Sequence, residues 1–326
     1  MSVIPAPFAG PLRAGVLVLA AVCAGAAAAG QGGRWSDWLD LLNQFEPFWL
    51  GGALAALASW LMLGRQGRAT PLLAGLGILI CAMMMGPDLI AAGAKAGHIA
   101  PGARTFKVVS YNLWERNVAP AATTRWILDQ DADVVVLAET PYEIYHDLHP
   151  HYPFRTTCSR RDRCATMIMS KVKPLAHGGL GDAGEPWTEM AWATYPAPDG
   201  PITIVGAHIT RPYPPGLQGA QVRRMASQLA QLPKDRMIVA GDYNSTPWSF
   251  ALRKQDKAFG LERRTHALFS WPTPNAHPLQ LLRLPIPILP IDQVYAGKGW
   301  RTVSIVRGPK LGSDHFPVVA TFTAGG

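Results

Sequence analysis

The chain has 326 residues, of which 48% are hydrophobic and only 16% are charged. An average soluble protein has roughly 25% charged residues, so part of this chain is expected to avoid water. Residues 1–103 hold only five of the 30 basic groups and four of the 22 acidic groups. The composition excludes a disordered chain, a coiled coil and a small disulfide-rich protein. It predicts a membrane region of residues 1–103 followed by one basic globular domain of residues 104–326.

The N-terminal third contains three uncharged stretches, each close to the roughly 20 apolar residues that a membrane-spanning helix needs. They lie between Arg13 and Arg34, between Glu46 and Arg65, and between Arg68 and Asp88, and they predict three transmembrane helices in succession over about residues 14–33, 47–64 and 69–90. Their frequent Gly, Ala and Met residues are typical of closely packed membrane helices. The first stretch also fits a cleavable signal peptide, because Arg13 precedes an apolar run that ends in alanines. Both interpretations place a lipid bilayer among the partners of the chain.

The charges between the predicted spans indicate how the chain crosses the membrane. Arg13 precedes the first span, Arg65 and Arg68 lie between the second and the third, and the remaining loop is net acidic. Because Lys and Arg are enriched in cytoplasmic loops, the N-terminus is predicted to be cytoplasmic and the globular domain extracytoplasmic. Cys158 and Cys164 in that domain either form a disulfide, as an oxidising compartment allows, or remain thiols.

From residue 104 onward, short apolar and β-branched runs alternate with helical or irregular segments. Helices are predicted for residues 119–130 and 220–232, and the proline-rich segment 269–290 is predicted to be an irregular surface loop. Strands are predicted for residues 106–111, 134–138, 166–169, 190–195, 202–208, 237–241, 291–295, 302–306 and 317–322. This many strands with few helices predict an α+β protein in which two sheets form a sandwich with helices outside.

Polar residues suited to metal and phosphate chemistry lie at the ends of several predicted strands, where a scaffold presents side chains into a crevice. They are Asn112, Glu139, His208, Asp242, Asn244, Asp292, Asp314 and His315. Carboxylate and amide oxygens suit Mg²⁺ or Mn²⁺, and histidines at zinc-binding spacing are not present. Taken singly, an Asn or Gly-Asp pair at a strand end also fits a plain turn. A plain turn explains Glu139 less well, because an acidic side chain at the end of a buried strand is unfavourable without a hydrogen-bonding partner or a metal ion.

The order of these motifs resembles the endonuclease/exonuclease/phosphatase superfamily over about residues 105–323. The motifs are Tyr111-Asn112, Glu139-Thr140, His208, Gly241-Asp242-Tyr243-Asn244, Ile291-Asp292 and Ser313-Asp314-His315. The superfamily includes deoxyribonucleases, apurinic endonucleases, neutral sphingomyelinases and inositol polyphosphate 5-phosphatases. The resemblance implies a four-layered α/β/β/α sandwich, with two central mixed β-sheets flanked by helices. Membrane-anchored bacterial members resemble the whole chain best, which implies a multi-pass protein of the bacterial inner membrane with a periplasmic catalytic domain.

The resemblance assigns residues to the metal and the attacking water. It implies that Glu139 is the principal ligand of Mg²⁺, or of Mn²⁺, that Asn112 lies close to the metal or the phosphate, and that Asp314 helps to hold the metal. Asp242 is implied to orient or deprotonate the water. Gln293 stands where many membrane-anchored relatives have His, and no catalytic role is assigned to it.

The resemblance also assigns residues that contact the phosphate. Asn244 is implied to hydrogen-bond a phosphate oxygen, and His315 to act on the scissile phosphate as an acid, a base or an electrostatic stabiliser. The resemblance implies that Asp292 fixes the tautomer of His315 and that His208 is a second imidazole facing the phosphate. Arg211 follows His208 closely and is either a phosphate contact or a solvated surface residue.

These residues predict a membrane-anchored, magnesium-dependent phosphohydrolase or phosphodiesterase in which an activated water attacks phosphorus in line. The shared residues contact only phosphate and metal, so a lipid headgroup, a nucleotide and a nucleic acid all remain candidate substrates. An extracytoplasmic nuclease with the same chemistry is one alternative, and a membrane scaffold without catalysis is another. No obligate protein partner can be read from the sequence.

Overall fold

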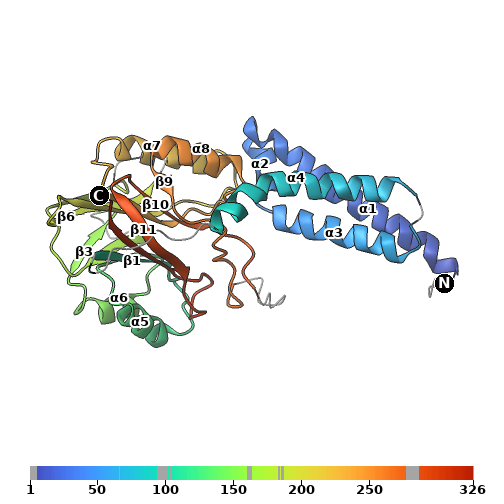
Figure 1. Ribbon diagram of the computed structural model, residues 1–326. Helices are drawn as coiled ribbons and strands as arrows, with labels where there is room; N and C mark the ends of the chain where they lie inside the picture. Colours follow the sequence, from blue (N-terminus) through green and yellow to red (C-terminus); the bar gives the residue numbers. More distant parts are fainter. Residues whose placement is uncertain are drawn as a thin grey trace. The chain divides into compact units, whose positions relative to one another are not determined.

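The computed structural model describes residues 6–65, 67–93, 102, 104–159, 164–182, 184, 187–276 and 286–325. The chain forms two compact units (Figure 1). One comprises Met1–Ala91 together with Thr246–Arg253, and the other comprises Ala92–Ser245 and Lys254–Gly326. The first unit is helical, and the second combines helices with two β-sheets.

The helical unit consists of apolar helices joined by short turns. Its elements are α1 (Ala6–Gly30), the 3-10 helix η1 (Gln31–Arg34), α2 (Asp37–Asn43), α3 (Glu46–Met62) and α4 (Ala69–Ala92). Two segments, Gly10–Arg34 and Ala69–Ala92, are long and apolar enough to cross a membrane. The prediction of three spanning helices is wrong for the middle stretch, because α3 has only 17 residues. At about 1.5 Å per residue it is shorter than the ~30 Å hydrocarbon core of a bilayer.

Small side chains fill the contacts between the long helices. Ala20 and Ala24 of α1, Ala53 and Ala56 of α3, and Ala74 of α4 are at most 2% exposed. Side chains of this size let helix backbones approach closely, which is how helices associate where apolar burial provides no net driving force.

The segment Thr246–Arg253 groups with the helical unit through hydrogen bonds to α2. The carboxylate of Asp40 accepts hydrogen bonds from the backbone N–H groups of Phe250 and Ala251 at 2.8 and 2.7 Å. These groups open α8 (Phe250–Phe259), and an acidic side chain stabilises the positive end of a helix dipole. Asp40 therefore acts as a cap for α8.

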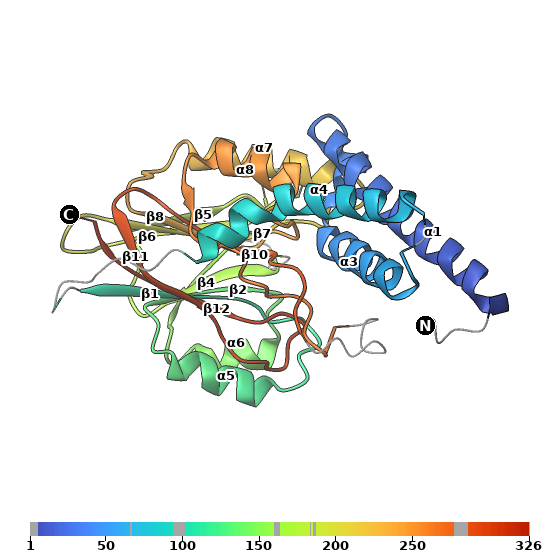
Figure 2. The same ribbon diagram turned by 45° about the vertical axis from the view of Figure 1, so that its right-hand side comes forward.

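Two six-stranded sheets form the centre of the second unit within the described residues. The first, in the order β11-β12-β1-β2-β4-β3, contains β1 (Thr105–Asn112), β2 (Val134–Ala138), β3 (Phe154–Thr157), β4 (Thr166–Ser170), β11 (Trp300–Arg307) and β12 (Val318–Ala324). The second, in the order β5-β6-β7-β8-β10-β9, contains β5 (Ala176–Gly179), β6 (Glu189–Tyr195), β7 (Ile202–His208), β8 (Met237–Asp242), β9 (Glu262–Arg263) and β10 (Asp292–Ala296). Helices α5 (Pro120–Asp129) and α6 (Tyr142–Leu148) cover the outer face of the first sheet, and α7 (Leu217–Leu229) covers that of the second (Figure 1, Figure 2).

This order of layers confirms the predicted α+β sandwich of two mixed sheets flanked by helices. In each sheet one pair of central strands is parallel, β1 with β2 and β7 with β8, and the remaining pairs are antiparallel. Aliphatic side chains from both sheets, such as Val108, Val136, Ile204 and Ile238, form the core between them. Gly206 lets the sheets approach closely, because a β-carbon there would lie 2.9 Å from Cγ1 of Val136.

The nine predicted strands and the two predicted helices of this unit are all present, with small shifts of their ends. The sequence prediction missed the short strands β3, β5 and β9 and the helix α6. The described part of segment 269–290 is irregular apart from a bridge between Trp271 and Leu289, and residues 277–285 lie outside the described residues. Cys158 and Cys164 form a disulfide, which decides between the two interpretations of this pair.

Candidate active site

Parallel pairing of β1 and β2 places two predicted site residues at the same edge of the first sheet. Asn112 ends β1 and pairs with Ala138, which ends β2 and is followed by Glu139. Nδ2 of Asn112 donates a hydrogen bond to Oε1 of Glu139 at 3.1 Å. The same nitrogen lies 3.1 Å from Oδ2 of Asp242, which belongs to the second sheet. One buried amide therefore joins carboxylates from both sheets.

The strand pairing of the second sheet brings three more predicted residues together. His208 at the end of β7 pairs with Asp242 at the end of β8, and Asp242 pairs in turn with Asp292 at the start of β10. Gly241 precedes Asp242 at a φ of +153°. A β-carbon there would lie 1.8 Å from the carbonyl oxygen of Ala207, so this turn into the site requires glycine.

Two site residues have a left-handed backbone conformation that is uncommon for residues other than glycine. Glu139 has a φ of +48° and Asn244 a φ of +47°. Such conformations cost on the order of 1–3 kcal/mol each and are concentrated at functional sites. The backbone N–H of Asn244 donates to Oδ1 of Asp242 at 2.8 Å, and its Nδ2 donates to the carbonyl of Ile209 at 3.0 Å. These contacts hold the Asn244 amide beside Asp242.

His315 lies between two buried carboxylates. Its Nδ1 is 2.9 Å from Oδ2 of Asp292, and its Nε2 is 3.5 Å from Oδ2 of Asp242. All three residues are at most 4% exposed. Burial by itself disfavours the imidazolium, but the charges of Asp292 and Asp242 outweigh it and raise the pKa of His315 to about 10. The surrounding carboxylates therefore favour the charged form of His315, and its Nδ1 lies against the carboxylate of Asp292.

His208 forms a second imidazole–carboxylate pair, with a residue that the sequence analysis missed. Its Nδ1 lies 3.1 Å from Oε2 of Glu189, while its Nε2 lies 3.5 Å from Oε1 of Glu139 and 3.9 Å from Oδ2 of Asp242. Burial opposes the charged form, but the hydrogen bond to Glu189 and the neighbouring charges of Asp242, Glu189 and Glu139 raise the pKa of His208 to about 9. The two histidines thus direct their Nε2 atoms toward Asp242, while Nδ1 of each contacts another carboxylate, Asp292 for His315 and Glu189 for His208.

Glu189 has a sequence signal that could have identified it. It begins β6 and lies directly opposite His208 in the antiparallel pairing of β6 with β7. An acidic residue at the end of an otherwise apolar strand carries the same signal as Glu139. The pairing of the two strands, which only the fold supplies, turns that signal into a contact.

We expect Glu189→Gln to lower kcat/KM about 10²-fold at most, because the amide still accepts a hydrogen bond but no longer stabilises the charge on His208. The measurement is Mg²⁺-dependent hydrolysis of a phosphate diester by the full-length chain. Glu143→Gln on α6, an exposed residue outside the site, is the matched control and should retain full activity. Equal activity of the Glu189 and Glu143 variants would remove His208 and its partner from the catalytic machinery.

Ser313 ties the last predicted motif to the strand ends. Its hydroxyl donates to the carbonyl of Asn112 at 2.7 Å and accepts from the backbone N–H of His315 at 3.0 Å. Asp314 follows Ser313, and its Oδ2 accepts a hydrogen bond from the indole N–H of Trp271 at 3.3 Å. The structure therefore positions Asp314 through its neighbours on either side and through Trp271 of the proline-rich segment.

The donor atoms of this site fit a hard divalent cation. Asp242, Asp292 and His315 offer ligand atoms within 4.8 Å of one another, but they are buried and bonded to each other. The side chain of Glu139 is 28% exposed, which makes it the more accessible carboxylate. Oxygen-rich sets of carboxylate and amide groups suit Mg²⁺, so Glu139, with Asn112 beside it, is the part of the site that fits an incoming metal ion.

Arg211 lies on the loop after β7 and is exposed. It stays a prediction as a phosphate contact. The other predicted site residues lie close together, and hydrogen bonds or close ion pairs join seven of them. These are Asn112, Glu139, His208, Asp242, Asn244, Asp292 and His315.

Comparison with solved structures shows the same fold in several proteins. SmcL matches with a TM-score of 0.53 and 17% sequence identity, covering 69% of this chain and 100% of SmcL. The endonuclease/exonuclease/phosphatase from Bacteroides vulgatus matches with a TM-score of 0.55 and 17% identity, covering 68% of this chain and all of the other. D. rerio TDP2 complexed with a single-strand DNA product matches with a TM-score of 0.54 and 16% identity, covering 67% and 99% of the two chains.

No curated protein matches the sequence. The sequence model described as the Endonuclease/Exonuclease/phosphatase family matches residues 109–315, a range that runs from the first central strand to His315. This match covers more than half of the chain and contains the converging site residues, and it confirms the resemblance drawn from the motifs. The chain therefore belongs to the endonuclease/exonuclease/phosphatase family.

Proposed function

We propose that the protein is a membrane-anchored, magnesium-dependent phosphodiesterase whose catalytic unit lies on the periplasmic side. The observation that carries this proposal is the convergence of two imidazole–carboxylate pairs on Asp242, His315 with Asp292 and His208 with Glu189. A phosphate diester is anionic and repels a nucleophile, so its hydrolysis needs fixed positive charge around the phosphoryl oxygens. Two imidazolium groups, each held by a neighbouring carboxylate, supply such charge.

The arrangement assigns a role to each side chain near the reacting phosphorus. Asp242 accepts a proton from the attacking water, because its carboxylate lies at the meeting point of both sheets and its burial raises its pKa. Nδ1–H of His315 donates to Asp292, which leaves Nε2–H facing the phosphate. As the new P–O bond forms, the ester P–O bond breaks, and a histidine donates a proton to the departing oxygen. Asn244 is held where its amide can stabilise a phosphoryl oxygen.

A divalent metal would be held by Glu139, with Asn112 and Asp314 nearby. When bound, it would offset charge on the phosphoryl oxygens and the leaving group. Mg²⁺ suits these donors best, and Mn²⁺ shares its preference for oxygen ligands.

The apolar helices support membrane anchorage. Gly10–Arg34 and Ala69–Ala92 qualify by length and composition, and the basic residues Arg13, Arg65 and Arg68 lie at one end of the helical unit. Basic residues favour the cytoplasmic side, and a disulfide such as Cys158–Cys164 forms in oxidising compartments. Both observations favour a periplasmic catalytic unit.

A thiol-labelling experiment tests this location. In protein taken from cells under non-reducing, denaturing conditions, we expect alkylation of Cys23 and Cys81 only, and of Cys158 and Cys164 only after reduction. Labelling of all four cysteines without a reductant would contradict an oxidising compartment.

A phosphodiester on a lipid is the favoured substrate, because anchorage raises the local concentration of membrane-bound substrates. A nuclease is the second candidate. It is favoured by the basic charge of residues 104–326 and by the fold shared with TDP2, whose structure contains a single-strand DNA product.

The test compares the full-length chain on phospholipid vesicles, single-stranded DNA and p-nitrophenyl phosphate, each with Mg²⁺ and with EDTA. Release of a phosphorylated headgroup as the fastest Mg²⁺-dependent reaction would support the lipid substrate. Faster cleavage of DNA would replace it with the nuclease, and preference for the monoester would replace both with a phosphatase.

A further inference from the structure

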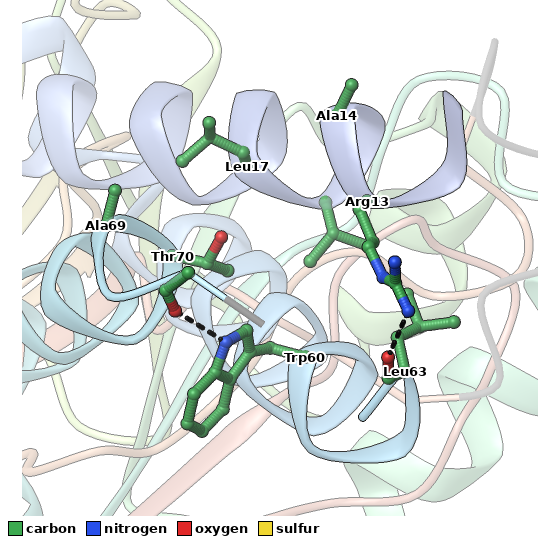
Figure 3. Close-up of a pocket in the computed structure, with 9 residues that line it drawn as sticks. Arg13, Ala14, Leu17, Trp60, Leu63, Ala69 and Thr70 are labelled. Carbon is green, nitrogen blue, oxygen red and sulfur yellow. Dashed lines mark hydrogen bonds between the residues drawn. The ribbon is translucent and has the colours of Figure 1, made fainter. Parts of the chain in front are cut away.

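A cavity lies at one end of the helical unit among α1, α3 and α4 (Figure 3). Its volume is about 200 Å³, and its polar lining consists of Arg13, Trp60 and Thr70, with Val16 and Leu17 among its apolar walls. A water molecule occupies roughly 30 Å³ in the liquid, so the cavity has room for a group the size of a phosphate ester.

Arg13 brings a cation with unused donors into this cavity. Its Nη2 donates to the carbonyl of Leu63 at 3.0 Å, just beyond the last turn of α3 (Figure 3). Its Nε is buried and has no hydrogen-bond partner among the residues that the structure describes. A guanidinium has five N–H donors, and a buried donor without an acceptor is unfavourable. The hydrogen bond to Leu63 therefore positions the guanidinium of Arg13 but leaves its buried Nε–H without an acceptor.

The start of α4 adds further donors to the same space. Thr70, in the first turn of α4, is only 7% exposed and lines the cavity. Its hydroxyl adds a polar group that can both donate and accept a hydrogen bond to the lining of the cavity. At the positive end of the α4 dipole, Pro71 has no N–H and the N–H of Leu72 bonds to the carbonyl of Arg68, which leaves the N–H groups of Ala69 and Thr70 as the backbone donors of the first turn. Guanidinium, hydroxyl and helix terminus together form an anion site.

The surroundings indicate the kind of anion. Arg65 and Arg68 are exposed near the same end of the unit, which is the end that favours the cytoplasmic surface of a membrane. The indole of Trp60 donates to the carbonyl of Gly67 at 3.0 Å, and indole rings are enriched at the level of lipid headgroups. The walls formed by Val16 and Leu17 are apolar. An anion with an apolar extension fits this combination better than a free inorganic ion.

We propose that this cavity binds the phosphate of an anionic phospholipid in the cytoplasmic leaflet, with the acyl chains lying against α1 and α4. Basic pockets between membrane helices on the cytoplasmic side are suited to phosphorylated lipid headgroups. The inference rests on the proposed membrane anchorage, and it is separate from the catalytic chemistry. It also requires α1 to remain part of the mature chain, because Arg13 lies on α1.

Native mass spectrometry of the full-length chain in detergent, supplied with equal amounts of phosphatidylglycerol and phosphatidylcholine, tests the proposal. We expect one phosphatidylglycerol to be retained by the wild type. Arg13→Gln should weaken retention at least tenfold, and Thr70→Val should weaken it less. Arg68→Gln removes the same charge from an exposed position at the same end and is the matched control, which should retain the lipid as the wild type does.

Equal retention by the Arg13 and Arg68 variants would overturn the proposal, as would an intact mass showing that α1 has been removed. Displacement of the lipid by millimolar inorganic phosphate would show a site for free phosphate and would also overturn it. Thermal unfolding and phosphodiester hydrolysis are measured on the same preparations. Because Arg13 lies outside the catalytic site, Arg13→Gln should keep wild-type hydrolysis and stability. Arg13→Lys should retain more lipid than Arg13→Gln, because it keeps the positive charge. Loss of hydrolysis in the wild type with lipid still retained would refute the enzyme proposal alone.

Discussion

His315→Ala is expected to lower the kcat of Mg²⁺-dependent phosphodiester hydrolysis by about 10³–10⁴-fold. The imidazole is the most deeply buried cation of the site, and its removal eliminates both a proton donor and a positive charge facing the phosphate. The measurement is steady-state hydrolysis by the full-length chain at saturating Mg²⁺. We expect the effect mainly in kcat, because this interaction strengthens as charge develops in the transition state.

Two further variants separate catalysis from folding at this position. Removing His315 leaves the buried carboxylate of Asp292 without its partner, which by itself destabilises a protein. His315→Gln keeps a hydrogen-bond donor near Asp292 and should unfold close to the wild-type temperature while remaining inactive. Asp292→Asn should be less damaging to kcat than either, because Asp292 orients the imidazole and does not contact the phosphate. Wild-type activity in His315→Gln would show that the site has been assigned wrongly.

Glu139→Gln is expected to lower hydrolysis by about 10²–10⁴-fold and to weaken Mg²⁺ binding. The amide nearly matches the carboxylate in shape and can still pair with Nδ2 of Asn112 through its oxygen, so the fold should be preserved. The lost charge removes the strongest available ligand for a hard cation. The decisive readout is direct metal binding by isothermal titration, measured together with activity over a range of Mg²⁺ concentrations.

The outcome at Glu139 has a matched control in Glu143→Gln, an equally isosteric change at an exposed position on α6. Unchanged metal affinity in Glu139→Gln, together with lost activity, would show that other residues bind the metal. The candidates would then be Asp242, Asp292 and His315, whose ligand atoms lie within 4.8 Å of one another.

Much of the sandwich could be predicted because its central strands are covered on both faces. β2 is apolar throughout and β8 is apolar up to its last residue, Asp242, which is the pattern of a buried strand. The missed strands β3, β5 and β9 are short edge strands of two to four residues with mixed polarity, and their existence depends on a neighbouring strand that already lies in place. The second of the three predicted membrane spans failed for a geometric reason, since the lack of charge continues beyond Met62 but the helix does not.

The site was predictable at positions where a polar residue interrupts a rigid, apolar context. Glu139 follows the buried strand β2 and Asp242 ends the buried strand β8, and the glycine before Asp242 is required by a contact with the neighbouring strand. Glu189 carries a similar local signal, but its contact with His208 could not be predicted, because it depends on the cross-strand register that sets the two residues opposite each other. The link between Trp271 and Asp314 also joins segments 43 residues apart and has no local sequence signal.

The most direct test of the central claim is the hydrolysis of bis-p-nitrophenyl phosphate by the purified full-length chain, first stripped with EDTA and then titrated with Mg²⁺. We expect no activity in EDTA, recovery with Mg²⁺ in the wild type, and no recovery in His315→Ala at any Mg²⁺ concentration. Hydrolysis that persists in EDTA, or that Mg²⁺ restores equally in the wild type and in His315→Ala, would contradict the assignment of this site as a metal-dependent phosphodiesterase centre.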